Sequence, residues 1–198
     1  LQLERLEAVE MSEHAKQRLS ALKNGLERTR LLLNQLLAFA RAQQVNNEGK
    51  TEISLQHVIR RVLEDLMPLA DAKHIDIGVV GEFDATLSVQ EFDLAALIKN
   101  LVDNAIHYTP DGGKIDLSLA RNLEKITLKI VDTGPGISEA ERERVFDPFY
   151  RVLGSEQIGS GLGLSIVKTI ATRIGVKIEL SSVSENSGLC VSVIFHES

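Results

Sequence analysis

The stretch that decides the fold spans residues 100–108 and reads Asn-Leu-Val-Asp-Asn-Ala-Ile-His-Tyr. On a helix, four of its polar or aromatic residues fall at positions i, i+4, i+7 and i+8 and therefore share one face. These residues are Asn100, Asn104, His107 and Tyr108. Carboxamide oxygens on such a face can hold a hard cation whose remaining ligands come from phosphates. Taken alone, two Asn side chains on a helix are more often solvated surface groups.

The next cluster downstream, residues 132–137, reads Asp-Thr-Gly-Pro-Gly-Ile and follows an alternating apolar run that predicts a strand. Glycine at positions 134 and 136 allows the backbone to approach a ligand closely. A buried carboxylate at Asp132 could accept a hydrogen bond from an exocyclic amine, such as that of adenine. An ordinary turn rich in Asp, Gly and Pro is the alternative interpretation.

A glycine-rich cluster, residues 159–164, reads Gly-Ser-Gly-Leu-Gly-Leu and opens a predicted helix. Alternating glycines at a helix N-terminus expose backbone N–H groups to anions. The cluster is not a Walker A loop, because no Gly-Lys-Ser/Thr follows it, and its spacing excludes a dinucleotide-binding fingerprint. By itself a glycine-rich loop does not identify a ligand.

Between these two clusters, residues 146–151 read Phe-Asp-Pro-Phe-Tyr-Arg. The simple interpretation is that the two Phe and the Tyr are core anchors. Residues 152–158, which connect this cluster to the glycine-rich loop, are predicted to form a mobile lid over a nucleotide.

Around the four clusters, helical and strand patterns mix without a regular alternation. Helical patterns cover about 56–73, 91–108 and 161–174, whereas alternating apolar residues predict strands near 75–79, 115–119, 126–130, 178–180 and 191–195. The strands at 114–119 and 125–131 are close enough to form an antiparallel hairpin. The predicted fold class is α+β, with an α/β sandwich in which helices cover one face of a mixed sheet.

Residues 1–47 have a helix-forming composition and an apolar seam with steps of three and four residues. The seam consists of Leu19, Leu22, Leu26, Thr29, Leu33, Leu36 and Ala40. We expect a helical hairpin over 1–47, in which Leu1, Leu3 and Leu6 end an earlier helix. A linker at 48–51 and a second domain at 52–198 follow.

Composition excludes several classes of protein. The chain has 198 residues, a formal net charge of −6 and one cysteine. It therefore has no global basic field for nucleic acid, no internal disulfide and no cysteine-rich zinc site. No apolar run approaches the length of a membrane span. Because the chain starts at Leu1 without a Met, we expect it to be a fragment of a longer protein.

In their order along the chain, the four clusters resemble the N, G1, F and G2 boxes of sensor histidine kinases of two-component systems. These kinases share one ATP-binding fold with the gyrase, Hsp90 and MutL ATPases. The resemblance covers about residues 52–195, and residues 1–47 resemble the end of the first helix and the whole second helix of the dimerisation and phosphoacceptor module. It implies a transfer of the γ-phosphoryl group of ATP to a histidine and then to a response regulator of the OmpR type. It also implies a homodimer joined through the helices, with this region in the cytoplasm and an inner-membrane anchor elsewhere in the parent protein.

The same resemblance implies roles for individual residues. Asn104 coordinates Mg²⁺ with Asn100 nearby, Tyr108 lies against adenine, and Asp132 accepts the adenine amino group. His107 stands where the family usually has Lys or Arg on a phosphate, which makes that contact weaker or pH-dependent. The remaining implied roles are pocket shaping by Gly134, Gly136 and Ile137, lid anchoring by Phe146 and Phe149, a γ-phosphate contact by Arg151, and a lid hinge and phosphate loop formed by Gly159, Ser160, Gly161, Leu162, Gly163 and Leu164.

Two departures from the family pattern matter. Residues 187–190 read Ser-Gly-Leu-Cys where the family often has Gly-Thr and an aromatic, which weakens the case for an adenine contact there. None of the five histidines begins the His-Glu/Asp-x-Arg-x-Pro motif of the family's phosphoacceptor. We therefore expect no autophosphorylation of this chain.

Two other classes of function remain as alternatives. A stand-alone ATPase of the gyrase or Hsp90 type needs a catalytic Glu where Asn100 stands, and Asn is a poor base. A non-catalytic dimeric scaffold would not need an intact set of boxes.

Overall fold

The computed structural model describes residues 14–22, 25, 26, 29, 33, 40, 51–81, 84–122, 125–152, 160–184 and 187–196. In the N-terminal region, the described residues are helical. The side chains of three described seam residues are largely exposed: Leu22 at 57%, Leu26 at 49% and Leu33 at 56%. The predicted tail at 1–6, Leu36 of the seam and most of the linker lie outside the described residues, so the helical hairpin stays a prediction.

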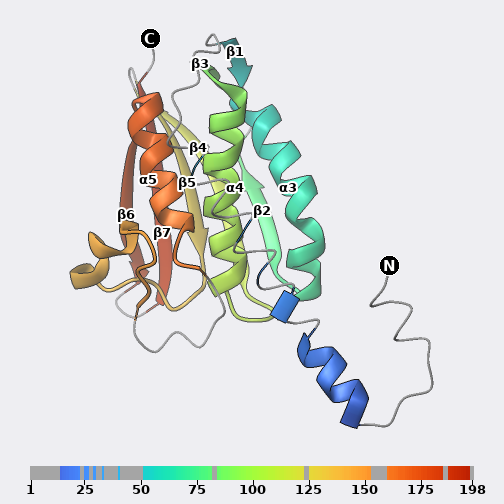
Figure 1. The fold of residues 1–198 in the computed structure, drawn as a ribbon. Coiled ribbons are helices and arrows are strands. Elements are labelled where there is room, and N and C mark those ends of the chain that lie inside the picture. The colour runs from blue at the N-terminus through green and yellow to red at the C-terminus, as the bar shows by residue number, and fades with distance from the viewer. Residues whose placement is uncertain are drawn as a thin grey trace.

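A five-stranded mixed sheet forms the centre of the fold (Figure 1). Its strand order is β2 (Asp76–Val80), β4 (Lys114–Asn122), β5 (Lys125–Asp132), β7 (Ser187–His196) and β6 (Lys177–Ser184). Strand β2 runs parallel to β4, and the other neighbours are antiparallel. The hairpin prediction is confirmed, because β4 and β5 pair from Ile115 with Asp132 to Asn122 with Lys125.

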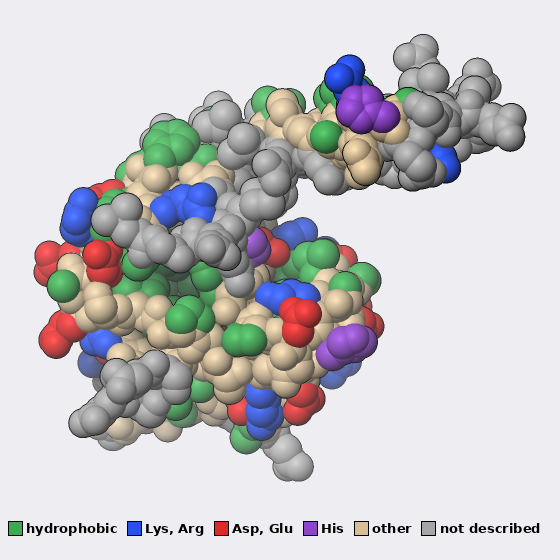
Figure 2. Space-filling model, turned by 90° about the horizontal axis from the view of Figure 1, so that it is seen from below, with side chains coloured by type: hydrophobic (Ala, Val, Ile, Leu, Met, Phe, Trp, Pro, Cys, Tyr) green, Lys and Arg blue, Asp and Glu red, His purple; other side chains and the backbone are tan. Residues whose placement is uncertain are grey.

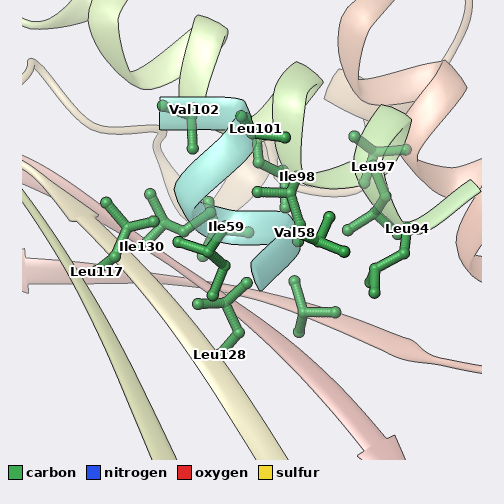
Figure 3. Packing of buried hydrophobic residues seen from close by; sticks show 14 of the residues in the cluster. Val58, Ile59, Leu94, Leu97, Ile98, Leu101, Val102, Leu117, Leu128 and Ile130 are labelled. Atoms are coloured by element: carbon green, nitrogen blue, oxygen red, sulfur yellow. The ribbon is translucent and has the colours of Figure 1, made fainter. Parts of the chain in front are cut away.

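Three helices cover one face of this sheet: α3 (Leu55–Ala72), α4 (Glu91–Tyr108) and α5 (Gly163–Ile174). Each buries an apolar stripe, as the helical periodicity of its sequence requires. Figure 3 shows how α4 residues such as Leu97 and Ile98 meet Val58 and Ile59 of α3 above strand residues such as Leu128. The predicted sandwich of helices on a mixed sheet is therefore confirmed.

The sequence patterns missed a second, two-stranded sheet. Strand β1 (Thr51–Ser54) pairs antiparallel with β3 (Thr86–Val89). Two short 3₁₀ helices, η1 (Glu139–Glu141) and η2 (Arg144–Phe146), also lie between β5 and α5. These elements of three or four residues are too short to produce a recognisable periodicity.

Candidate functional site

A cavity of about 360 Å³ opens beside the C-terminal half of α4, the end of β5 and the start of α5. Figure 2 shows the molecule from below, with hydrophobic side chains inside a hollow and charged side chains around it. Three of the four sequence clusters contribute several residues to the walls, and the Phe-rich cluster contributes Tyr150 and Arg151. The topology thus gathers at one end of the sheet residues that are distant in sequence.

Helix α4 supplies one wall of the cavity through its half-buried polar face. The Asn100 amide nitrogen donates to the Ala96 carbonyl at 2.7 Å, which leaves the Asn100 side-chain oxygen as an acceptor. Asn104 lies against the first residue of α5, since a Cβ added at Gly163 would come within 3.0 Å of the Asn104 oxygen. The Asn100 carboxamide is therefore held by the helix backbone, and the Asn104 carboxamide lies close to the start of α5.

Asp132 forms a second wall and is only 5% exposed. Its Oδ1 accepts hydrogen bonds from the backbone N–H of Gly134 at 2.8 Å and of Leu189 at 3.3 Å. Burial raises the pKa of the Asp132 carboxyl, and the two backbone N–H groups oppose that rise. Among the hydrogen bonds of the described residues, none uses its other oxygen.

His107 contributes a neutral nitrogen to the cavity. Its Nε2 is buried without a hydrogen-bond partner among the described residues. Burial lowers the pKa of His107; Asp103 opposes this shift, whereas Lys73 and Arg151 add to it. The ring lies edge-on to Tyr108, with centroids 5.0 Å apart. The site therefore holds a polar atom whose hydrogen bond is unmade, which is costly without a ligand or water.

Glycines permit the close approach of the two loops that border the cavity. Gly161 has a φ of +72°, and a Cβ there would lie 2.7 Å from the carbonyl carbon of Phe149. The Phe149 N–H donates to the Gly161 carbonyl at 3.0 Å. A Cβ at Gly134 would lie 3.0 Å from the Tyr108 carbonyl oxygen. A side chain at either position would push these segments apart.

The structure brings most of the predicted site residues together. Those that line the cavity are Asn100, Asn104, His107, Tyr108, Asp132, Gly136, Ile137, Arg151, Ser160, Gly161, Gly163 and Leu164. Gly134 bonds to Asp132 instead, and Leu162 is fully buried at the start of α5. Phe146 is half-buried outside the lining, and Phe149 is 63% exposed, so the interpretation of Phe149 as a core anchor is wrong. Gly159 and most of the predicted lid lie outside the described residues.

Sequence reasoning missed several lining residues. Tyr150 lines the cavity, its hydroxyl bonds to the Glu141 carboxylate, and the Arg144 guanidinium lies 4.4 Å from its ring centroid. Leu189 also lines the cavity, although its segment departs from the family pattern. Its contribution through a backbone N–H is independent of side-chain identity and so leaves no signal in the sequence.

Comparison with known proteins identifies the family. Residues 89–198 match the family model described as histidine kinase-, DNA gyrase B-, and HSP90-like ATPase, which is more than half of the chain. The chain belongs to this ATPase family. The match confirms the ATP-binding fold that the four clusters led us to expect.

Named relatives narrow the resemblance to sensor kinases. The chain is 31% identical over 191 residues to the swarming motility regulation sensor protein RssA of Serratia marcescens, covering 95% of this chain and 40% of RssA. The solved mycobacterial sensor histidine kinase MprB matches with a TM-score of 0.67 and 26% identity over 74% of this chain and 97% of MprB. The histidine kinase ThkA, solved in complex with the response regulator TrrA, matches with a TM-score of 0.74 over 99% of this chain and 55% of ThkA; at 23% identity this match shows the fold alone. The predicted resemblance to sensor histidine kinases is confirmed.

The chain spans less than half the length of the curated relatives that it matches. In the part that the structure describes, no helix is both long and apolar enough to cross a membrane. The same part holds no cluster of three His, Cys, Asp or Glu residues suited to a metal ion.

Proposed function

We propose that the cavity binds Mg²⁺-ATP and that this chain is the ATP-binding catalytic region of a sensor histidine kinase. The observation that carries the proposal is the buried Asp132, which keeps one carboxylate oxygen for a ligand while the backbone holds the other. The adenine amino group is a donor suited to that oxygen. Apolar neighbours, among them Ile130 and Leu189, supply the walls that an aromatic base requires.

The phosphate end of the proposed site is the polar face of α4 with the start of α5. Backbone N–H groups at the N-terminus of α5 favour an anion, and glycines at 161 and 163 keep that approach open. The Arg151 side chain and the His107 imidazole border the same space. We assign the γ-phosphate contact to Arg151, and we assign a neutral hydrogen bond to His107.

Mg²⁺ fits the donor set at this end. The Asn100 oxygen is left as an acceptor, and the Asn104 carboxamide lies one helical turn further on. Neutral oxygens with phosphates and waters suit Mg²⁺, which seldom occupies an all-protein cage. When bound, the ion supplies charge neutralisation on the phosphates.

The proposed reaction is transfer of the γ-phosphoryl group to a histidine nitrogen on a helical acceptor module, and then to an aspartate of a response regulator. The 31% identity to the sensor protein RssA supports this class of partner. We further propose a regulator of the OmpR type, a homodimer formed through the N-terminal helices, a cytoplasmic location for this region and a membrane anchor elsewhere in the longer protein.

Replacing Asp132 by Ala tests the adenine contact. We expect Asp132→Ala to weaken ADP binding by roughly 1–3 kcal/mol, because a buried acceptor and its two backbone bonds are lost. Isothermal titration calorimetry at a temperature where circular dichroism shows both proteins folded gives the affinity. Asp65→Ala, at an exposed position on α3, is the matched control and should bind like the wild type. Unchanged affinity in Asp132→Ala discards the adenine assignment.

A further inference from the structure

Helix α4 ends at the cavity without the usual glycine cap. Its last residue is Tyr108, and the C-cap Thr109 has an extended backbone (ψ 131°) because Pro110 follows it. The Thr109 N–H bonds back to Ala105, but Pro110 has no N–H to offer. The final carbonyls of the helix therefore need donors from another part of the chain.

Lys73 supplies those donors. This residue is the C-cap of α3, and its ammonium group donates to the carbonyls of Ile106 at 2.8 Å, His107 at 3.0 Å and Thr109 at 2.6 Å. All three N–H groups of the ammonium therefore donate to carbonyls at one helix end. The positive charge also lies at the negative end of the α4 dipole, which strengthens the contact.

The helix turn that Lys73 holds is the one that lines the nucleotide pocket. His107 and Tyr108 both reach the cavity from it, and the Tyr108 carbonyl packs against Gly134 beside Asp132. Fraying of this turn would displace the side chains of His107 and Tyr108. It would also displace the Tyr108 carbonyl, which packs beside Asp132. The backbone of Lys73 also accepts a hydrogen bond from Gly112, which ties in the loop after α4.

We propose that Lys73 is a positioning residue for nucleotide binding: its ammonium group closes the end of α4 and so holds His107 and Tyr108 in the pocket. Lys73 is outside the cavity lining, so we assign it no direct contact with the nucleotide. The inference rests on the proposed ATP site, and it concerns a residue outside all four sequence clusters.

The test compares graded substitutions at residue 73 by ADP calorimetry in the presence of Mg²⁺. Lys73→Arg keeps a cation with several N–H donors. Lys73→Gln replaces the cation by a neutral amide on a shorter side chain, and Lys73→Met leaves only an apolar side chain. We expect affinity to fall about tenfold or more in Lys73→Gln and further in Lys73→Met, and to stay within about threefold in Lys73→Arg. Lys129→Met removes the same charge at an exposed site on β5 and should leave affinity unchanged.

Hydrogen exchange tests whether the end of α4 is coupled to the nucleotide site, because a merely structural role predicts fraying but no specific restoration of Thr109 protection by ADP. In Lys73→Gln without nucleotide, the Thr109 amide should lose protection while amides in the middle of α4, such as that of Leu101, keep theirs. Added ADP should restore the Thr109 protection. A lower melting temperature with unchanged affinity would mean a structural role only and overturns the inference.

The outcomes separate the two proposals. Failure of the wild type to bind ADP overturns the proposed function and this inference with it. If the wild type binds ADP and the affinity of Lys73→Gln is within about twofold of the wild-type affinity, the inference alone is overturned. If Lys73→Met does not fold, the Gln and Arg variants still decide the question.

Discussion

At the scale of single residues, His107 makes nucleotide-free stability depend on pH. Burial lowers its pKa from the ordinary value of 6.5, so the folded protein binds fewer protons there than the unfolded chain. The stability that neutral His107 contributes is complete above pH 6.5 and is lost as the pH falls through the lowered pKa. The charges of Asp103 on α4, Lys73 at the end of α3 and Arg151 modify the size of this effect.

Urea unfolding of the wild type and His107→Gln measures this contribution. We expect the wild type to lose more stability than the variant between about pH 7.5 and about pH 5.5. His57→Gln, at an exposed position on α3, should follow the wild type. Parallel losses in the wild type and His107→Gln would show that His107 protonates equally well in both states.

Sequence reasoning pointed to those cavity residues whose type and spacing form a local pattern. Asn100, Asn104 and Asp132 could be found because type and spacing already define a polar helix face and an acidic strand end. Lys73 and Leu189 could not, because each contact joins a side chain to the backbone of a distant segment that only the fold brings close. Phe149 was misjudged, since an aromatic side chain indicates burial on average but not in a given loop.

At the scale of elements, a glycine lies near each end of α5. The two glycines have the same backbone conformation but different surroundings. Gly161 (φ +72°) meets the backbone of Phe149, whereas Gly175 (φ +75°) at the C-cap has nothing within 4 Å of an added Cβ. Gly175→Ala should therefore cost only the left-handed strain of about 1 kcal/mol. Gly161→Ala should cost more in stability and should also weaken ADP binding.

Thermal unfolding of Gly161→Ala and Gly175→Ala measures the loss of stability, and calorimetry measures their ADP affinity. The two variants carry the same chemical change, so the difference between them isolates the contact with Phe149. Equal losses of stability with equal ADP affinities would mean that the approach of residue 161 to Phe149 does not shape the pocket.

Element boundaries were predictable where periodicity and length were both sufficient. Helix α4 begins and ends where its 18-residue pattern predicts, with Pro110 marking the stop. Strands β1 and β3 are only four residues long, which is too short for a recognisable alternation. Their pairing joins residues 32 to 38 positions apart, such as Ser54 with Thr86 and Thr51 with Val89, which no local pattern relates.

At the scale of the whole molecule, the exposed seam predicts self-association. Leu22, Leu26 and Leu33 are largely exposed in this single chain, and helical pairing would bury them. We expect a weak dimer whose population falls on dilution and falls further in Leu26→Asp. Light scattering over a concentration series measures this, with Gln17→Asp as a control at an exposed position outside the seam. A tight dimer that is insensitive to Leu26→Asp would place the interface elsewhere.

The 198-residue chain should not phosphorylate itself. Transfer requires an acceptor nitrogen in line with the γ-phosphate at roughly 3–3.5 Å. No histidine of the printed sequence lies in the acceptor motif, and His107 borders the pocket that would hold the phosphates. Incubation with γ-labelled ATP should label an added helical module that carries the motif and leave the chain unlabelled. Acid-labile label on the chain alone would contradict this, and its loss in His14→Gln would identify His14 as the acceptor.

The hydrogen bond from Leu189 to Asp132 has a kinetic consequence. It joins residues 57 positions apart, across the pairing of β5 with β7 that unites two local hairpins. Hairpins close quickly, whereas a pairing between distant segments must first overcome the entropy of closing a long loop. The end of the pocket that we propose for adenine therefore forms only after the hairpins have joined, and nucleotide binding there would have to wait for that step. Bound nucleotide should accordingly slow the unfolding of the domain and leave its folding rate nearly unchanged.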